Sequence, residues 1–342
     1  MKGRRVSAKP TISDVAARAG VSKGLVSLAL NDKPGVASAT RLRILQAVED
    51  LGFRASHAAR ALSSSKTGTL GLVLARRPEM LRADPFFPPF IAGLEQVIAP
   101  IGMALMLRFV SDVREEKQAY TELANGRVDG VFVTDLRQAD PRPSLLAELR
   151  LPAVSLNRPS EDSRIPAVCL DDLPGVRTAL DHLIALGHRR IAHVGGPQEY
   201  LHADRRRSAW AETLSAAGLP PGSWVESDFT AAGGARATAE LLDAPHPPTA
   251  ILYASDLMAV SGMAEAHRRG LSVPGDLSIV GFDDAELSAH LHPPLTTVRT
   301  DAFAWGQASA SAMVALLGGG VVTDVQLPSA SFILRGSTAP PP

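Results

Sequence analysis

The chain has 342 residues, of which 45% are hydrophobic, so it can bury a large core in two or three domains. No apolar run approaches the ~20 residues of a membrane span, and the first thirty residues lack the pattern of a secretory signal. A single cysteine, Cys169, excludes internal disulfides, and no Cys-x-x-Cys or His-Glu-x-x-His spacing predicts a metal site. We therefore expect a cytoplasmic globular protein with no membrane partner, no metal and no cofactor.

The zero net charge hides two opposite parts. Residues 1–66 carry twelve Lys/Arg against four Asp/Glu, a net charge of +8, and the remaining residues carry a net charge of −8. A basic module joined to an acidic one is expected where one end of a chain meets phosphates. A solvated basic tail is the alternative, but Arg18, Lys23 and Arg41 lie within patterned helices. The charge distribution favours a nucleic-acid partner.

Residues 11–31 predict two short helices joined by a tight turn, the arrangement of a DNA-reading helix-turn-helix. Thr11 can cap the first helix, with Asp14 in its first turn, where a carboxylate is favoured by the helix dipole. Gly20 tolerates the left-handed conformation that ends a helix, and Ser22 can cap the second helix. An ordinary amphipathic helical hairpin is the alternative interpretation.

The apolar positions of these two helices recur at helical spacing and predict which side faces inward. The inward residues are Val15, Ala16 and Ala19 in the first helix and Val26, Ala29 and Leu30 in the second. The outer face of the second helix is left with Lys23, Gly24, Ser27 and Leu28. Small residues between the helices and polar ones outside suit a helix that lies in a DNA groove.

A third helix is predicted to begin at a capping Ser38 and to end at Gly52. Its predicted apolar face consists of Leu42, Leu45, Val48 and Leu51. Residues 56–64 are predicted to form a further, conditional helix, which is too short to be stable alone and would need a partner. Residues 63–68 read as a flexible linker.

From residue 69 onward, short apolar runs alternate with helical patterns, which predicts parallel sheets covered on both faces. The first set of expected strands lies at 70–74, 103–107, 128–133 and 153–156, with helices at 90–98 and 115–124. The second set of strands lies at 167–170, 191–194, 250–253 and 277–281, with helices at 176–186, 208–217, 235–242 and 257–269. Two such series predict an α/β body of two doubly wound lobes, with a ligand in the cleft between them.

One enzyme motif occurs by letter, because residues 20–24 match Gly-x-Ser-x-Gly. That nucleophile elbow requires a strand before its serine, whereas a helix is predicted here and Ser22 already serves as a cap. No phosphate-cradling loop and no nucleophile–base pair is evident. We expect no catalytic residues, which disfavours the alternative of a cytosolic hydrolase.

The whole chain resembles the LacI–GalR family of bacterial transcription regulators, the lactose- and purine-repressor type. The resemblance rests on about a dozen short motifs that follow the family's order over nearly the whole length. They include Thr-Ile-Ser-Asp-Val-Ala at 11–16, Ala-Gly-Val-Ser at 19–22, Val-Ser-Leu-Ala-Leu-Asn at 26–31, Asp-Pro-Phe-Phe at 84–87, Leu-Gly-His-Arg-Arg-Ile at 186–191 and Val-Gly-Phe-Asp-Asp at 280–284. Such a protein is a ligand-responsive regulator, typically a repressor, and not an enzyme. A periplasmic sugar-binding protein has a similar body but needs a signal peptide and no basic head.

The resemblance implies a homodimer whose two heads bind a palindromic double-stranded DNA operator. By position, Lys23, Gly24 and Leu28 match the residues with which the family selects bases, beside the capping Ser22. Lys23 can donate to guanine, whereas Leu28 can offer only apolar contact, such as to a thymine methyl. Many relatives carry arginine at this last position. The phosphate contacts would come from Ser27 and Asn31.

The resemblance implies that the conditional helix at 56–64 folds in the minor groove of DNA, where it pairs with the same helix of its dimer mate. Leu62 would wedge into the central base step and kink the duplex, with Ala59 contacting base edges beside it. The alternative for Leu62 is an ordinary linker residue. The implied organisation is a head at 1–55, a hinge at 56–68, a first lobe at 69–166 plus about 299–325, and a second lobe at 167–298 plus about 326–342.

The resemblance also implies an effector cleft for a sugar-like or nucleoside-like molecule. Phe86 and Phe87 would form an aromatic wall opposite Phe229, Arg206 would grip ligand oxygens, and Asp283 would accept ligand hydroxyls. Polar residues at or just after strand ends complete the expected site: Thr134, Asp135, Asn157, Arg158, Asp171, Ser255 and Asp256.

Each of these residues also has an ordinary structural interpretation. The two phenylalanines at 86 and 87 could belong to the core. Ser255 and Asp256 could cap the helix that begins near Leu257, and residues 205–207 could form a solvated basic run.

Overall fold

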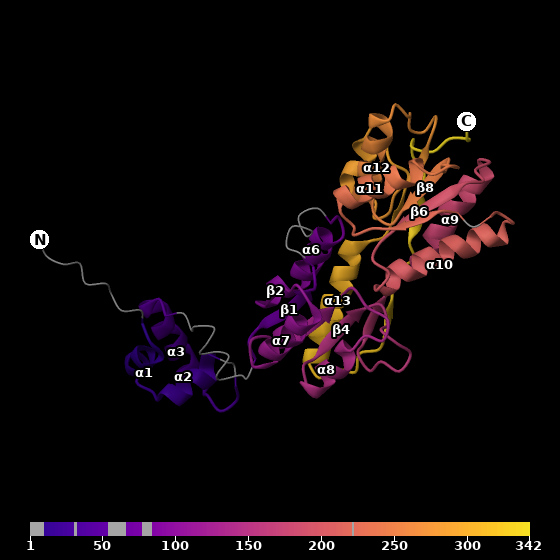
Figure 1. Ribbon diagram of the computed structural model, residues 1–342. Helices are drawn as coiled ribbons and strands as arrows, with labels where there is room; N and C mark the ends of the chain where they lie inside the picture. The colour runs from indigo at the N-terminus through magenta and orange to yellow at the C-terminus, as the bar shows by residue number, and fades with distance from the viewer. Residues whose placement is uncertain (1–9, 31–32, 54–65, 77–83, 221) are drawn as a thin grey trace, which may run out of the picture. The chain divides into compact units, whose positions relative to one another are not determined.

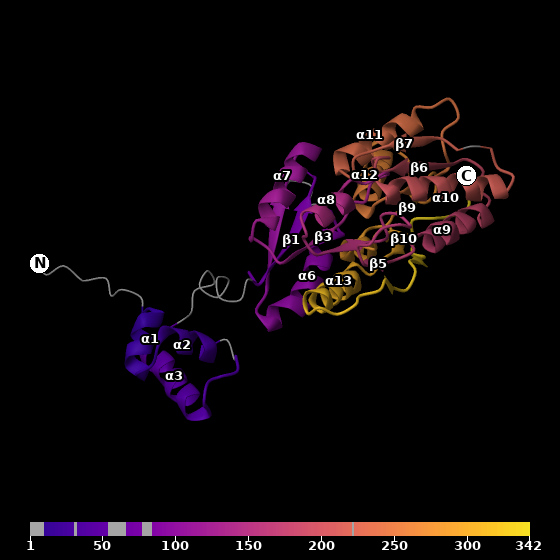
Figure 2. The same cartoon turned by 90° about the horizontal axis from the view of Figure 1, so that it is seen from below.

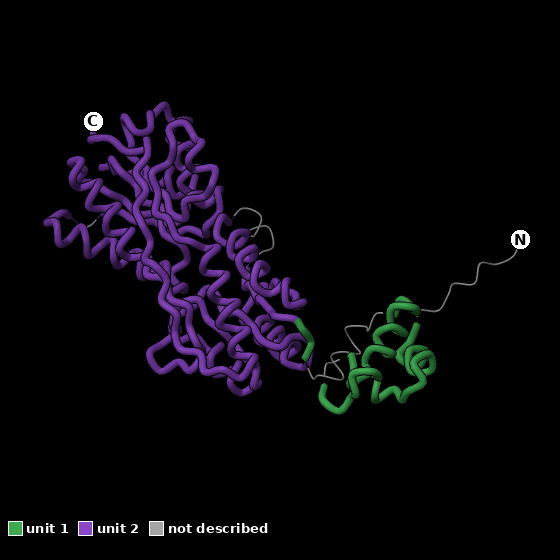
Figure 3. Tube along the Cα trace, turned by 180° about the vertical axis from the view of Figure 1, so that it is seen from behind, with its two compact units in different colours: residues 1–68 green, residues 69–342 purple. Residues whose placement is uncertain are grey.

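The computed structural model describes residues 10–30, 33–53, 66–76, 84–220 and 222–342. The chain divides into two compact units, residues 1–68 and 69–342, which Figure 3 distinguishes by colour. Each unit has its own core, since the described residues of the first unit's apolar cluster all lie within 12–53. Among the described residues no helix is long and apolar enough to cross a membrane.

The first unit contains three described helices: α1 (Ile12–Ala19), α2 (Lys23–Leu30) and α3 (Ser38–Leu51) (Figure 1). At the start of α1 the Asp14 carboxylate accepts hydrogen bonds from the backbone N–H and the hydroxyl of Thr11, both at 2.7 Å. Gly20 ends α1 in the left-handed conformation, with φ of 64°, as its sequence position predicts. The helix-turn-helix arrangement is therefore confirmed.

The core of the first unit shows one error in the predicted face of α3. Ile44 and Ala47 are the buried residues of α3, whereas Leu42 is 70% exposed and Leu45 is 45% exposed. Ile44, Ala47, Val48 and Leu51 also recur at helical spacing, and this neighbouring stripe is the one that packs on α1 and α2. The helix also begins one residue earlier than predicted, because Ala37 is the N-cap and Ser38, the predicted cap, is the first helical residue.

The second unit begins with a parallel six-stranded sheet in the order β11-β5-β4-β3-β1-β2. Its strands are β1 (Thr69–Leu74), β2 (Ala104–Phe109), β3 (Gly130–Val133), β4 (Ala153–Leu156), β5 (Ala167–Cys169) and β11 (Val325–Gln326). One face packs on α6 (Phe87–Ile98) and α13 (Ala302–Leu317), and the other on α7 (Val113–Ala124) and α8 (Arg142–Glu148). We call this sheet and its helices the first lobe.

The second lobe is built on a parallel four-stranded sheet in the order β7-β6-β8-β9. Its strands are β6 (Ile191–Gly195), β7 (Trp224–Glu226), β8 (Ala250–Tyr253) and β9 (Ser278–Val280). One face packs on α9 (Leu173–Ala185) and α10 (Leu201–Ala216), and the other on α11 (Ala231–Leu242) and α12 (Asp256–Arg268) (Figure 2). The two doubly wound lobes predicted from the alternating pattern are thus present.

The strand at 167–170 was predicted in the second lobe, and that assignment is wrong. β5 pairs in parallel with β4, with Ser155 opposite Ala167 and Leu156 opposite Val168, so it extends the first sheet. The apolar run predicts a strand but carries no information about its neighbour. The chain enters the second lobe only after β5.

The chain returns to both lobes near its end. The helix α13 and the strand β11 complete the first lobe, while β10 (Thr297–Arg299) pairs antiparallel with β12 (Ser331–Ile333). Farther on, the Ile279 N–H donates to the Ser337 carbonyl at 2.9 Å, which joins the tail to β9. Both lobes are therefore built from separated stretches of sequence.

Two glycines allow α6 and α13 to cross at close range. A Cβ added to Gly93 would lie 2.1 Å from the Phe303 carbonyl oxygen, and one on Gly306 would lie 2.2 Å from the Phe90 carbonyl oxygen. Each helix thus packs backbone against backbone at this point. The pair of helices forms the covering layer on one face of the first sheet.

Candidate functional site

The outer face of α2 is open to solvent, as a DNA-reading helix requires. Ser22, Lys23, Gly24 and Leu28 are exposed, and Ser27 is half-buried. The Ser22 hydroxyl accepts the Leu25 N–H at 3.2 Å, so its predicted capping role is confirmed. Asn31, Ala59, Leu62 and the hinge at 56–64 lie outside the described residues, and their proposed DNA contacts stay predictions.

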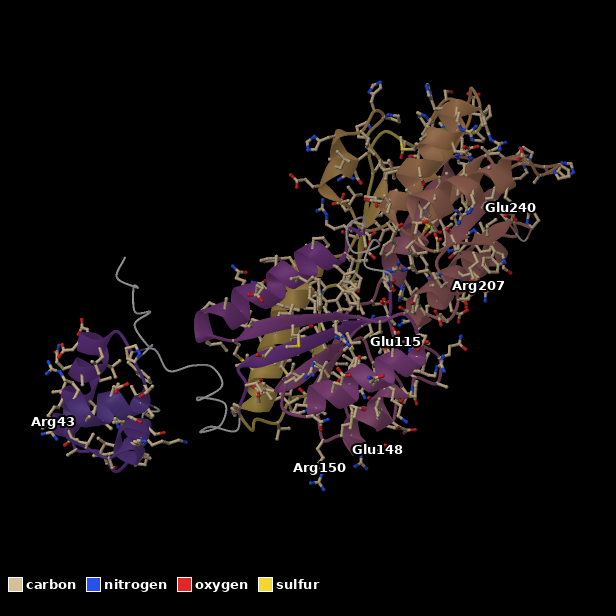
Figure 4. The ribbon with its side chains drawn as sticks, turned by 60° about the vertical axis from the view of Figure 1, so that its left-hand side comes forward. Arg43, Glu115, Glu148, Arg150, Arg207 and Glu240 are labelled. Atoms are coloured by element: carbon tan, nitrogen blue, oxygen red, sulfur yellow. The ribbon has the colours of Figure 1, made fainter. Side chains whose placement is uncertain are left out.

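Two of the arginines in the first unit have structural partners. Arg18 pairs with Asp50 at 2.9 Å and joins α1 to α3. Arg41 donates to the carbonyl oxygens of Ala29 at 3.0 Å and Lys33 at 2.9 Å, at the end of α2. Arg43 projects from the surface of α3 (Figure 4). The basic character of this unit therefore serves its folding as well as any contact with phosphate.

A pocket lies between the two lobes of the second unit, at the carboxyl ends of strands from both sheets. Its lining contains ten of the twelve residues predicted from the sequence. They are Phe86, Phe87, Thr134, Asp135, Asn157, Arg158, Arg206, Phe229, Ser255 and Asp283. The structure thus brings together residues spread over about two hundred positions of sequence.

The backbone is strained around this pocket. Four lining residues other than glycine have positive φ angles: Asp135 at 49°, Asn157 at 64°, Phe229 at 59° and Asp283 at 113°. Such conformations cost of order 1–3 kcal/mol each and cluster at ligand sites, where the surrounding structure enforces them. All four residues lie in segments that follow strands, and their side chains line the pocket.

Arg76 is the first of the charged residues that the sequence analysis missed. It lies after β1 with its guanidinium paired to both Asp84 and Asp135, at 2.7 Å and 2.6 Å. Burial raises the pKa of Asp84, and the Arg76 charge only partly opposes this effect. Burial also acts to raise the pKa of Asp135, but Arg76 and His202 outweigh it, so that this pKa is lowered.

Arg206 projects into the pocket from α10, as predicted. Its Nε donates to Asp172 at 2.5 Å and its Nη1 donates to the Ala254 carbonyl oxygen at 3.3 Å. The guanidinium carbon lies 3.5 Å from the centre of the Phe282 ring. Held by an ion pair and a ring face, the guanidinium presents its remaining N–H donors in a fixed orientation.

The Asp283 carboxyl group has surroundings that oppose ionisation. Burial raises its pKa well above the ordinary value, and the nearby carboxylates of Asp256 and Asp84 raise it further. A neutral carboxyl group can both donate and accept a hydrogen bond. Asp283 therefore suits a hydroxyl group of a ligand better than it suits a cation held by charge alone.

Aromatic rings form two walls of the pocket. In the first lobe, the Phe86 ring stacks on Phe90 with centroids 5.5 Å apart and meets Trp305 edge-on at 5.8 Å. Phe87 is 2% exposed, so it belongs chiefly to the core. In the second lobe, Phe229 lies over Gly196, where an added Cβ would come within 2.0 Å of the ring. Gly196 thus makes room for this ring.

Several predicted polar residues line the pocket but are already engaged. Arg158 donates from Nε to Asp324 at 2.8 Å. The Asn157 Oδ1 accepts the Leu170 N–H at 2.8 Å, which leaves its amide nitrogen as the group suited to a ligand. The Ser255 hydroxyl accepts the Met258 N–H as the N-cap of α12, and Thr134 is buried.

Two predicted site residues, Asp171 and Asp256, do not line the pocket. Asp171 accepts the Leu173 N–H at 3.2 Å, and its neighbour Asp172 reaches the pocket instead. The Asp256 carboxylate accepts hydrogen bonds from the Ser288 and Thr297 hydroxyls, each at 2.6 Å. Asp256 therefore joins α12 to the segments around β10, and its assignment to the effector site is wrong.

Thirteen residues that the sequence patterns did not predict also line the pocket. They are Arg76, Asp84, Pro85, Leu136, Leu156, Asp172, Leu201, His202, Arg205, Ala254, Phe282, Thr300 and Trp305. Two of these residues could have been predicted, because Arg76 follows a predicted strand and Asp84 begins one of the family motifs. His202 could not, because it lies in the first turn of α10 rather than after a strand. Burial lowers its pKa to about 4, so it lines the pocket as a neutral ring.

The geometry defines a helix-turn-helix unit joined in sequence to a two-lobed ligand-binding body. Residues 11–56 match the model of bacterial regulatory proteins of the lacI family, and residues 180–338 match a periplasmic binding protein-like domain. The chain is 33% identical to the HTH-type transcriptional regulator CelR of Thermobifida fusca, covering 93% of this chain and 95% of that protein. It is 31% identical to the HTH-type transcriptional repressor CytR of Escherichia coli K12, covering 99% of each.

Solved structures agree with these similarities. A Lac repressor dimer bound to operator and the anti-inducer ONPF matches with a TM-score of 0.83 and 29% identity, over 97% of this chain and 100% of that one. A CelR–cellobiose complex matches with a TM-score of 0.72 and 32% identity, over 96% of this chain and 99% of that one. The protein belongs to the LacI family, which consists of transcription regulators rather than enzymes.

Proposed function

We propose that this LacI-family regulator is a repressor that binds a palindromic operator as a homodimer and responds to a sugar-like or nucleoside-like effector. The observation that carries the proposal is the two-lobed pocket, in which Asp283, Arg206 and Asn157 surround space walled by aromatic rings. Rings that stack and polar groups with few fixed orientations suit a polyhydroxylated ring. The cellobiose in the CelR complex is an example of this ligand class.

The proposal assigns DNA reading to the exposed face of α2. Lys23 donates to guanine, Gly24 permits close approach of the backbone, and Leu28, 39% exposed, makes apolar contact. Ser27 and Asn31 contact phosphates, and the segment 56–68 with Ala59 and Leu62 engages the minor groove. The head at 1–55 works with a first lobe at 69–170 plus about 299–326. The second lobe consists of residues 171–298 and about 327–342. The protein acts in the cytoplasm.

DNA binding is tested by selecting duplexes from a randomised pool by gel retardation. We expect a two-fold symmetric consensus whose affinity falls steeply with salt, because phosphate contacts release counterions. Lys23→Ala should weaken binding, and Lys117→Ala, on the exposed side of α7, is the control that should not. Selection of sequences without symmetry, or equal effects of both variants, would refute the assignment.

The effector site is tested by thermal shift with cellobiose, glucose, cytidine and adenosine. A ligand that binds only the folded body raises its melting temperature. We expect Asp283→Ala, which removes both the donor and the acceptor, to weaken binding of the active compound at least tenfold while operator binding without it is retained. An undiminished response of Asp283→Ala would remove that residue from the site.

A further inference from the structure

Arg76 is fixed to the first lobe by two carboxylates. Its Nε donates to Asp135 Oδ2 at 2.8 Å and its Nη2 to Asp135 Oδ1 at 2.6 Å. Its Nη1 donates to Asp84 Oδ2 at 2.7 Å. The side chain is only 8% exposed, so these charge-assisted bonds form away from bulk water. The guanidinium is therefore held in one position.

The aromatic rings around this guanidinium come from both lobes. Its central carbon lies 5.3 Å from the ring centre of Phe87 in the first lobe. It lies 5.5 Å from Tyr200 and 5.4 Å from Phe229, both in the second lobe. Rings within about 6 Å attract a cation. Three rings and two carboxylates thus form a cage for a cation, and the chain fills that cage with its own arginine.

Further contacts between the lobes lie beside the cage. The Leu201 N–H donates to the Leu136 carbonyl oxygen at 2.8 Å, and Gln138 donates to Asp204 at 3.3 Å. Arg137 and Tyr200 form an isolated antiparallel bridge. These contacts join residues 136–138 to residues 200–204. Arg76 therefore lies next to a second connection between the lobes, which is made largely by backbone groups.

We propose that Arg76 is a releasable tie that holds the start of α10 and the Phe229 segment of the second lobe against the first lobe. The ion pairs anchor the guanidinium on one side, while the ring contacts on the other side carry no hydrogen bond and can separate. Phe229 also lines the pocket. On the proposed function, an effector that stacks on Phe229 competes with Arg76 for that ring and loosens the tie.

Tyr200 provides a test that spares the effector pocket, because it contacts Arg76 without being among the lining residues. Tyr200→Leu removes the ring, whereas Tyr200→Phe keeps the ring and removes only the hydroxyl. Arg76→Gln removes the cation itself but leaves two buried carboxylates. The tyrosine pair therefore keeps the test valid even where Arg76→Gln fails to fold.

The measurement is amide hydrogen exchange of the effector-free, full-length protein. Exchange of the Leu201 N–H reports separation from Leu136, because local opening exposes the bonded amide. Loss of one cation–π contact should accelerate it by roughly three- to tenfold. We expect this acceleration in Tyr200→Leu and Arg76→Gln, near-normal exchange in Tyr200→Phe, and unchanged exchange in β1 and β6.

Unchanged Leu201 exchange in Tyr200→Leu would overturn the proposal. Equal acceleration in Tyr200→Leu and Tyr200→Phe would also overturn it, because it would assign the effect to the hydroxyl. The measurement uses neither DNA nor effector. Its failure is therefore distinguishable from failure of the proposed repressor function, which retardation and thermal shift decide.

Discussion

Asp256 is a buried carboxylate that serves packing rather than ligand binding. Burial raises its pKa to about 6, although hydrogen bonds from Ser288, Thr297 and the Ala285 N–H oppose the shift. In an unfolded chain the same group titrates near ~3.9. The folded state therefore holds the proton more tightly than the unfolded state, and ionisation of Asp256 works against folding.

This difference predicts a pH dependence of stability. The raised pKa contributes stability that is fully present below about pH 4 and is lost as pH rises through about 6. The advantage of wild type over Asp256→Asn in free energy of unfolding should shrink by about 2 kcal/mol from pH 4 to pH 7. Denaturant unfolding at several pH values measures it.

Asp276→Asn supplies a control of opposite sign. Hydrogen bonds from the Ser272 hydroxyl and backbone lower the pKa of this exposed carboxylate. Its contribution to stability is present above the unfolded pKa and is lost on acidification, so its difference from wild type should grow with rising pH. Parallel slopes for the two variants would contradict the environment described for Asp256.

At the scale of single residues, the sequence patterns predicted which residues lie near the pocket better than they predicted the hydrogen-bond partner of each residue. Asp171 and Asp172 are adjacent after β5, yet only the second reaches Arg206. Strand-end position predicts the region, whereas the direction of each side chain depends on local backbone angles. Asp135 was predicted at the pocket and lies there, but its carboxylate is taken by Arg76, a residue 59 positions away.

At the scale of elements, the crossing of α6 and α13 depends on the absence of side chains. Gly306→Ala places a Cβ 2.2 Å from the Phe90 carbonyl oxygen, so the helices must move apart. We expect the body to lose about 1–3 kcal/mol of unfolding free energy, as for other overpacked cores. Chemical denaturation measures the loss. Ser311→Ala, exposed on the same helix, should change it by less than about 0.5 kcal/mol.

The elements themselves were largely predictable because apolar periodicity is a local property. The strand predicted at 153–156 coincides with β4, and the helix predicted at 257–269 differs from α12 by one residue at each end. The predicted face of α3 was right at Val48 and Leu51 but wrong at Leu42 and Leu45. Two overlapping apolar stripes run along this helix, and the sequence does not say which one meets α1 and α2. The helix α13 was not predicted at all, since its small and apolar residues surround it on all sides.

At the scale of the whole molecule, two separate cores predict two unfolding transitions. Among the residues that the structure describes, the apolar cluster of the head lies within 12–53, and the larger clusters lie beyond residue 69. In calorimetry, a selected operator duplex should raise the transition of the head, and an active sugar or nucleoside should raise that of the body. A single transition shifted equally by both ligands would contradict this independence.

Sheet membership was the part of the architecture that sequence could not supply. Residues 167–170 were recognisable as a strand, but only the partner β4 decides their lobe. Such pairing depends on contacts between residues far apart in the chain, and the sequence of one strand does not identify the strand beside it. The charge difference between the two parts of the chain, in contrast, is a sum over residues and does not depend on how the chain folds.

The late return of the chain to both lobes bears on how the protein is made. β11 at Val325–Gln326 completes the first sheet, and Ser337 bonds to β9 of the second. On the ribosome, neither half of the body can reach its final form until these residues emerge, whereas the described apolar core of the three-helix head is complete within the first 53 residues. Synthesis therefore delivers a finished DNA-reading head well before the machinery that senses the metabolite.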